Sequence, residues 1–224
     1  MSYLANIVTG LGLLSAFLSI IFSLEHHFTF ASWAIILAVI FDGLDGQVAR
    51  RQKMRSEFGG EFDSLVDAIS FGVAPTVLGY IFVYSHFHLW TVLPLFLYLL
   101  FSVARLARFN ITPKEKTPGY FYGLPTTASG GMMASFILVH RRYGLEVHPA
   151  IFVVMVLLLA FLMISRVRYL NLSSLNKISG KIVYLVLGGG FIVAVIFPEI
   201  TAFVIFIIYL VFSPFVVKSF IAVK

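Results

Sequence analysis

The sequence predicts an all-α membrane protein, a polytopic bundle of about eight transmembrane helices. Of its 224 residues, 60% are hydrophobic and only 12% are charged, whereas soluble domains are about 45–50% apolar and about 25% charged. The mean hydropathy is correspondingly high, at +0.98. The apolar residues also gather in stretches long enough to cross a bilayer, which takes roughly 20 residues in a helix. The composition therefore excludes a water-soluble globule and a disordered chain.

Eight apolar stretches fit membrane spans. They run over about residues 4–24, 30–50, 57–84, 89–109, 123–139, 148–165, 180–197 and 199–217. Since helices of about 20 residues each use most of the chain, we expect residues 1–224 to form a single membrane domain. The fifth stretch is diluted by Pro125, Gly130, Gly131 and several hydroxyl residues, so a re-entrant or interfacial segment stays open there.

The basic residues predict the orientation, because cytoplasmic loops of membrane proteins are rich in Lys and Arg. With the N-terminus in the cytoplasm, all basic residues except Arg141 and Arg142 fall on the cytoplasmic side of the eight spans. Both termini are then cytoplasmic, in the cell membrane. The net charge of +6 is explained by this orientation and by an anionic substrate, and we expect no nucleic-acid partner.

All four aspartates of the chain fall in one short stretch, on two expected helices. At about 100° per residue, the acids of each helix share a face with small or polar residues. The first face holds Asp42, Asp45, Gly46, Ala49 and Arg50, and the second holds Gly59, Asp63, Asp67 and Ser70. The connector over residues 51–57 is short, so the two helices should be antiparallel neighbours. Their cytoplasmic ends would then bring four carboxylates into one pocket.

Four carboxylates cannot all stay ionised side by side without cations. Hard oxygen ligands, in a chain without cysteine and with no histidine nearby, favour Mg²⁺ or Mn²⁺ over zinc. A pair of such ions could clamp a pyrophosphate and neutralise its leaving group. The small residues Gly46, Ala49 and Gly59 leave room for a base or phosphates, although close helix packing also uses small residues. A structural charge network or an ion pathway is the alternative for the acids.

The pattern Asp42-x-x-Asp45-Gly46-x-x-Ala49-Arg50, then eight residues, then Gly59-x-x-x-Asp63-x-x-x-Asp67, resembles the signature of the CDP-alcohol phosphatidyltransferases. Further segments are similar to the CDP-diacylglycerol–serine branch of that family. They are Phe62 to Pro75, Arg105-Leu-Ala-Arg108-Phe-Asn110, Phe121-Tyr-Gly-Leu-Pro125 and Leu162-Met-Ile-Ser-Arg166. The segment Thr126-Thr127-Ala128-Ser129 departs from that branch, which more often has a second proline and an alanine run.

This resemblance implies roles for individual residues. Asp42, Asp45, Asp63 and Asp67 would hold two divalent cations, and Asp67 would also be the general base. The residues expected to contact the CDP-activated lipid are Gly46, Ala49, Arg50, Ser56 and Gly59. The resemblance further implies a homodimer whose polar site opens to the cytosol while the lipid tails remain in the bilayer.

The reaction that the resemblance implies is transfer of the phosphatidyl group from CDP-diacylglycerol to L-serine, with release of CMP. Since the motif contains no residue suited to a covalent intermediate, we expect direct displacement by the serine hydroxyl. The same signature also serves inositol phosphate, glycerol phosphate and choline-type acceptors, and an archaeal ether lipid could replace diacylglycerol. A transporter or channel is the alternative outside the enzymes.

Two arginines are candidates for binding the acceptor. Arg105 and Arg108 lie three residues apart at the cytoplasmic end of the fourth span, with Asn110 beyond them. One of them could hold the serine carboxylate, because a guanidinium matches a carboxylate with two parallel hydrogen bonds. The alternative is that both are anchors on the positive side of the membrane. Asn6 and Thr9, at the start of the first span, form an Asn-x-x-Thr feature that lies either near the nucleotide or only at a helix start.

Overall fold

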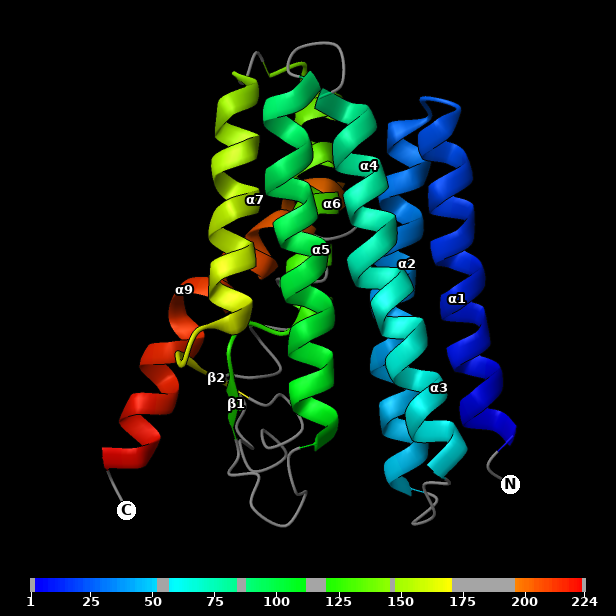
Figure 1. Ribbon diagram of the computed structural model, residues 1–224, viewed down its shortest axis with the longest axis vertical. Helices are drawn as coiled ribbons and strands as arrows, with labels where there is room; N and C mark the ends of the chain where they lie inside the picture. Colours follow the sequence, from blue (N-terminus) through cyan, green and yellow to red (C-terminus); the bar gives the residue numbers. More distant parts are fainter. Residues whose placement is uncertain are drawn as a thin grey trace.

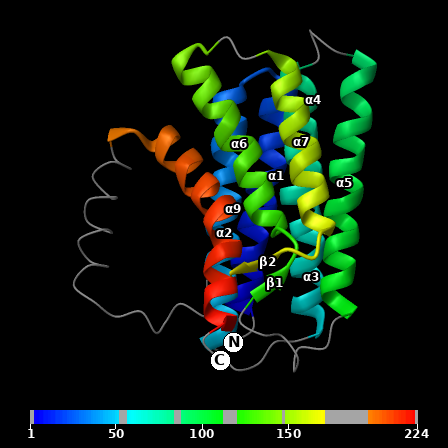
Figure 2. The same ribbon diagram turned by 90° about the vertical axis from the view of Figure 1, so that its left-hand side faces the viewer.

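The computed structural model describes residues 3–51, 57–83, 88–111, 120–145, 148–170 and 196–222. These form a bundle of long helices with a small two-stranded sheet near one end (Figures 1 and 2). The elements are α1 (Tyr3–Leu24), α2 (Phe28–Arg51), α3 (Glu57–Asp67), a π-helical segment (Ala68–Val73), α4 (Ala74–Val83), α5 (His88–Ile111), β1 (Tyr120–Tyr122), α6 (Thr126–Tyr143), α7 (Pro149–Ile164), β2 (Arg168–Leu170) and α9 (Pro198–Ala222).

Within the described part of the chain, five helices are long and apolar enough to cross a membrane. They cover Leu4–Leu24, Phe28–Val48, Glu57–Val83, Trp90–Ile111 and Pro198–Lys218, and they coincide with the first four predicted spans and the last. Helices α6 and α7 occupy the fifth and sixth predicted stretches, and α7 is apolar but has only 16 residues. The predicted seventh span, 180–197, lies almost wholly outside the described residues. The helical membrane bundle is therefore confirmed, and the count of eight spans stays a prediction.

Helices α1 and α2 run in opposite directions along the bundle, as do α4 and α5, whereas α3, the π-helical segment and α4 form one continuous helix (Figure 1). The first turn of α1 and the last turn of α9 lie at the same end (Figure 1). Helix α1 packs against α2 and α4, while α5 packs against α7. Helix α6 contacts α2, α4 and α9, which places it inside the bundle.

The small residues that dilute the fifth predicted span explain this interior position. Most of α6 is buried from Thr126 to Leu138, so close neighbours surround it. A Cβ added at Gly130 would lie 3.2 Å from the Phe71 ring and 3.3 Å from the Phe71 Cα. A Cβ at Gly131 would overlap the Phe206 ring of α9. Glycine at these positions lets two helices approach α6 closely, as small residues do in membrane bundles.

The all-α prediction missed one short sheet. Strands β1 and β2 pair antiparallel, with Phe121 opposite Tyr169. Gly123 follows β1 with a φ of 78°, a left-handed conformation that glycine adopts at little cost. Helix α6 therefore begins at Thr126, after this turn and Pro125, rather than at residue 123. Three-residue strands give too short an alternating pattern to be distinguished from a loop in the sequence.

The predicted third span is helical throughout, but its hydrogen-bond pattern changes in the middle. Residues Ala68–Val73 form a π-helical segment between α3 and α4, and the Ala74 N–H donates to the carbonyl of Ile69, five residues back. Pro75 follows immediately and has no N–H to continue the helical pattern. Such segments are rare and frequently mark functional sites; this one begins directly after Asp67.

The contact between α6 and the π-helical segment predicts a stability effect. Gly130→Val should lower the unfolding temperature in detergent by several degrees, because the added atoms overpack against Phe71, at a cost of about 1–3 kcal/mol. Gly10→Val is the control, since a Cβ there meets nothing within 4 Å. Thermal unfolding followed by circular dichroism would measure both. Equal unfolding temperatures for the two variants would contradict this account of the α6 packing.

Candidate metal centre

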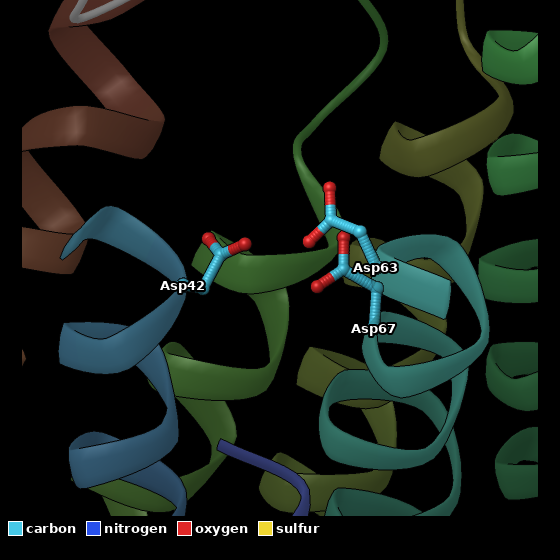
Figure 3. A group of neighbouring side chains, drawn as sticks. All are labelled: Asp42, Asp63 and Asp67. Carbon is cyan, nitrogen blue, oxygen red and sulfur yellow. The ribbon is translucent and has the colours of Figure 1, made fainter. Parts of the chain in front are cut away.

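Three carboxylates from two helices converge on one point. Asp42 projects from α2, and Asp63 and Asp67 project toward it from α3 (Figure 3). One carboxylate oxygen from each of the three lies within 4.8 Å of the others. Asp63 and Asp67 are four residues apart, so the helical repeat places them one above the other on the same face. The sequence predicted that the acids of the two helices would lie together, and the structure shows this for Asp42, Asp63 and Asp67.

The fourth aspartate, Asp45, is not among these three but lines the same pocket. It is only 6% exposed, and its Oδ2 accepts a hydrogen bond of 2.8 Å from the Thr9 hydroxyl of α1. A buried carboxylate needs such partners, because leaving it unpaired in a low-dielectric interior is costly. Thr9 therefore sits beside the acidic cluster, and the interpretation that the Asn-x-x-Thr feature lies near the nucleotide stays a prediction.

A second threonine holds the carboxylate of Asp42. The Thr127 hydroxyl, in the first turn of α6, donates to Asp42 Oδ2 at 3.1 Å. A hydrogen bond of this kind orients a carboxylate toward a bound cation and is part of how proteins tune metal sites. The sequence singled out Thr127 only as a departure from a family pattern, and nothing local in the sequence connects it with a residue 85 positions away.

A pocket opens at the carboxylates, between α1, α2 and the helix that carries α3 and the π-helical segment. Most of its polar lining groups are the aspartates, and the other lining residues are apolar or small. The lining residues are Thr9, Gly12, Ala38, Asp42, Asp45, Asp63, Val66, Asp67, Ser70 and Phe71. All four aspartates thus face one space, as the sequence predicts.

The residues predicted to contact the CDP-lipid are only partly described by the structure. Gly46 in α2 and Gly59 in α3 are half-buried and lie outside the set of residues that lines the pocket. Ala49 and Arg50 belong to the last turn of α2, but their side chains lie outside the described part of the chain, as does Ser56 altogether. Their predicted roles stay predictions.

The structure gives the two candidate arginines different surroundings. Arg105 is 7% exposed, its Nε has no hydrogen-bond partner among the described residues, and Asp67 is close enough to attract it electrostatically. Arg108 donates to the carbonyls of Tyr122 at 3.0 Å and Ile164 at 3.3 Å. The guanidinium of Arg108 thus joins the end of α7 to β1, while Arg105 is buried near Asp67.

Asn110, the third acceptor candidate, lies at the exposed end of α5. Its Oδ1 accepts a hydrogen bond of 3.0 Å from the Ser64 hydroxyl of α3. Ser64 directly follows Asp63, so this bond fixes α5 against the helix that carries two of the carboxylates. Asn110 thus lies near the carboxylates, but its side chain is hydrogen-bonded between α5 and α3.

The donor set fits a hard divalent cation. It consists of carboxylate oxygens, with no cysteine in the chain and with no histidine in the acidic group found among the described residues. Oxygen ligands of this kind suit Mg²⁺ and Mn²⁺. Carboxylates within 4.8 Å of one another also repel each other strongly when ionised, and a bound cation removes that repulsion. Asp42, Asp63 and Asp67 are the residues that would hold it.

The chain belongs to the CDP-alcohol phosphatidyltransferase family. The model of that family matches residues 2–164, which include every element from α1 to the end of α7. The acidic helices and the pocket between them all lie inside the matched region.

Several curated relatives share most of this region. The CDP-diacylglycerol–serine O-phosphatidyltransferase of Helicobacter pylori (strain ATCC 700392 / 26695) is 36% identical over 168 residues, covering 74% of this chain and 71% of the relative. The enzyme of the same name from Methanocaldococcus jannaschii is 32% identical over 167 residues, covering 74% and 73%. The Saccharomyces cerevisiae enzyme of that name is 38% identical over 137 residues, covering 55% and 49%.

The hydrogen bond from Thr127 predicts an effect on cation binding. Thr127→Val removes the donor to Asp42 while keeping the shape of the side chain, and it should weaken Mn²⁺ binding by about tenfold, as is typical when a partner of a metal-binding residue is lost. The loss of the free Mn²⁺ signal in electron paramagnetic resonance measures binding directly. Thr201→Val, which removes a hydroxyl bonded to the Phe197 carbonyl, should bind Mn²⁺ as the wild type does. Equal affinities in the two variants would refute the role of Thr127.

Proposed function

We propose that this protein transfers the phosphatidyl group of CDP-diacylglycerol to L-serine, forming phosphatidylserine and releasing CMP. The observation that carries the proposal is the cluster of Asp42, Asp63 and Asp67 at the pocket between α2 and α3. Family membership supports the donor class and the reaction type. The shared name of relatives from a bacterium, an archaeon and a yeast supports serine as the acceptor.

The proposed placement is the cell membrane, with eight spans, both termini in the cytoplasm and the pocket open to the cytosol. Two observations support it. The first turn of α1 and the last turn of α9 lie at the same end of the bundle (Figure 1). The C-terminal part of α5, which carries Arg105 and Arg108, lies at the same end (Figure 1), where the positive-inside rule places the cytoplasm. A water-soluble acceptor and the CMP product would then exchange with the cytosol.

The donor lipid would bind with its polar part at the carboxylates and its acyl chains in the bilayer. We assign two Mg²⁺ or Mn²⁺ ions to the four aspartates, and such ions supply charge neutralisation of the pyrophosphate and of the departing CMP. The groups assigned to the nucleotide and its phosphates are Gly46, Ala49, Arg50, Ser56 and Gly59. We further propose that the protein acts as a homodimer surrounded by membrane lipids.

In the proposed reaction, Asp67 accepts the proton of the serine hydroxyl. The serine oxygen then forms a bond to the phosphorus that bears the diacylglycerol, and the bond from that phosphorus to the bridging oxygen of the pyrophosphate breaks. CMP leaves with the electron pair. A carboxylate acts as a general base when it lies within hydrogen-bond distance of the proton it removes, and Asp67 lines the pocket together with the other three aspartates.

Arg105 is the residue we assign to the carboxylate of serine. It is buried close to Asp67, and a buried guanidinium with an unpaired N–H favours an anionic partner. A serine bound by its carboxylate at Arg105 would present its hydroxyl toward Asp67. Arg108 and Asn110 would contribute by holding α5 in place, through the hydrogen bonds from Arg108 to the Tyr122 carbonyl and from Ser64 to Asn110.

Replacement of the proposed base tests the reaction. Asp67→Asn should lower the rate of CMP release from CDP-diacylglycerol and serine by at least about a hundredfold, the usual contribution of a general base. Glu61→Gln, which removes an exposed carboxylate from the same helix, is the matched control and should keep its rate. Inositol phosphate and glycerol phosphate in place of serine should give no CMP above background. Undiminished turnover by Asp67→Asn would refute the assignment.

The acceptor assignment predicts a change in KM. Arg105→Lys should raise the KM for serine by about tenfold, because a lysine cannot form two parallel hydrogen bonds to a carboxylate, while the KM for CDP-diacylglycerol changes little. Arg108→Lys should leave the KM for serine unchanged and lower the unfolding temperature, since its bonds run to carbonyl groups. A normal KM for serine in Arg105→Lys would remove Arg105 from the acceptor site.

A further inference from the structure

The π-helical segment that follows Asp67 is supported by a buried tyrosine from another helix. Pro75 cannot donate a backbone hydrogen bond, and in an α-helix its missing N–H is the one that would bond the carbonyl of Phe71, four residues earlier. A buried carbonyl without a donor is costly, so nearly all such groups are paired in folded proteins. Here the Tyr98 hydroxyl of α5 donates to the Phe71 carbonyl at 2.9 Å.

The surroundings of Tyr98 show that this bond belongs to the interior of the bundle. The tyrosine is 0% exposed, so water cannot replace its hydroxyl at the Phe71 carbonyl. The neighbouring carbonyl of Gly72 is bonded in a similar way, by the Thr76 hydroxyl at 2.7 Å. Side-chain hydroxyls thus serve two successive carbonyls of the segment, at the place where proline interrupts the backbone pattern.

The same tyrosine also reaches the helix that orients Asp42. The hydroxyl oxygens of Tyr98 and Ser129 are 3.1 Å apart, and Ser129 lies in the first turn of α6, two residues after Thr127. Thr127 in turn donates to Asp42. The Tyr98 hydroxyl therefore lies between the segment that begins after Asp67 and the helix turn that holds Asp42.

We propose that Tyr98 is a positioning residue for the carboxylate cluster. By donating to Phe71, it holds the π-helical segment in register, and this segment fixes how far α3, with Asp63 and Asp67, is rotated about its axis relative to α4. By its contact with Ser129, it ties that helix to the turn that orients Asp42. The inference rests on the proposed metal site, and it assigns Tyr98 no contact with substrate or cation.

Mn²⁺ binding to the full-length protein in detergent, followed by the signal of free Mn²⁺, tests the proposal apart from activity. Tyr98→Phe keeps the ring and removes the hydroxyl, and it should weaken Mn²⁺ binding by about tenfold, which reflects the loss of one buried hydrogen bond at the Phe71 carbonyl. Tyr209→Phe is the matched control. Its hydroxyl makes a similar bond of 3.0 Å to the Leu170 carbonyl of β2, and its removal should leave Mn²⁺ binding unchanged.

Pro75→Ala provides the decisive second variant, because alanine restores a backbone N–H at position 75, and in α-helical register that N–H reaches the Phe71 carbonyl. In the Tyr98→Phe/Pro75→Ala double variant, Mn²⁺ affinity should return to within about twofold of that of Pro75→Ala alone, so the two changes should be far from additive. The same recovery is expected if Tyr98→Phe alone fails to fold. A double variant that binds as weakly as Tyr98→Phe, or that does not fold, would overturn the proposal.

The outcomes separate this inference from the proposed function. If the wild type binds no Mn²⁺, the metal site itself is wrong, and the role of Tyr98 is wrong with it. If the wild type binds Mn²⁺ and Tyr98→Phe binds it equally well, the positioning role fails while the proposed metal site stands.

Discussion

The mutual repulsion of carboxylates at the end of a membrane bundle is the constraint on which the rest of this structure depends. Asp42, Asp63 and Asp67 offer oxygens within 4.8 Å of one another, an arrangement that is unfavourable for ionised groups without a cation. Acidic residues in membrane helices are also costly and usually functional. The fold keeps these residues together instead of separating them, and a divalent cation bound by oxygen ligands is the simplest compensation for both costs.

The surrounding helices can be understood as support for this cluster. Helix α1 supplies Thr9 for Asp45, and α6 supplies Thr127 for Asp42. Helix α6 reaches this position because Gly130 lets it approach Phe71 closely. Each of these contacts joins a different helix to the pocket, so the geometry of the site depends on the packing of the whole bundle rather than on α2 and α3 alone.

The sequence predicted those parts of the site that depend on local periodicity. The spacing of Asp63 and Asp67 places them on one helical face, and the short connector between α2 and α3 predicted that the acids of the two helices would meet, although α3 packs mainly against α1. The hydrogen bonds from Thr127 to Asp42 and from Tyr98 to the Phe71 carbonyl join helices that are distant in the sequence, and a single sequence does not contain such contacts. The different surroundings of Arg105 and Arg108 have the same origin, since two arginines on one helix look alike until their neighbours are known. Most helices were predictable from apolar length, but the two strands were too short to leave a pattern.

The central claim is that Asp42, Asp63 and Asp67 bind the divalent cation that phosphatidyl transfer requires. It is tested most directly by an anomalous difference map from crystals of the wild type soaked in Mn²⁺, recorded near the manganese absorption edge. The account predicts anomalous density between α2 and α3, within bonding distance of these three carboxylates. Strong anomalous density elsewhere in the protein, with none between these carboxylates, would contradict it.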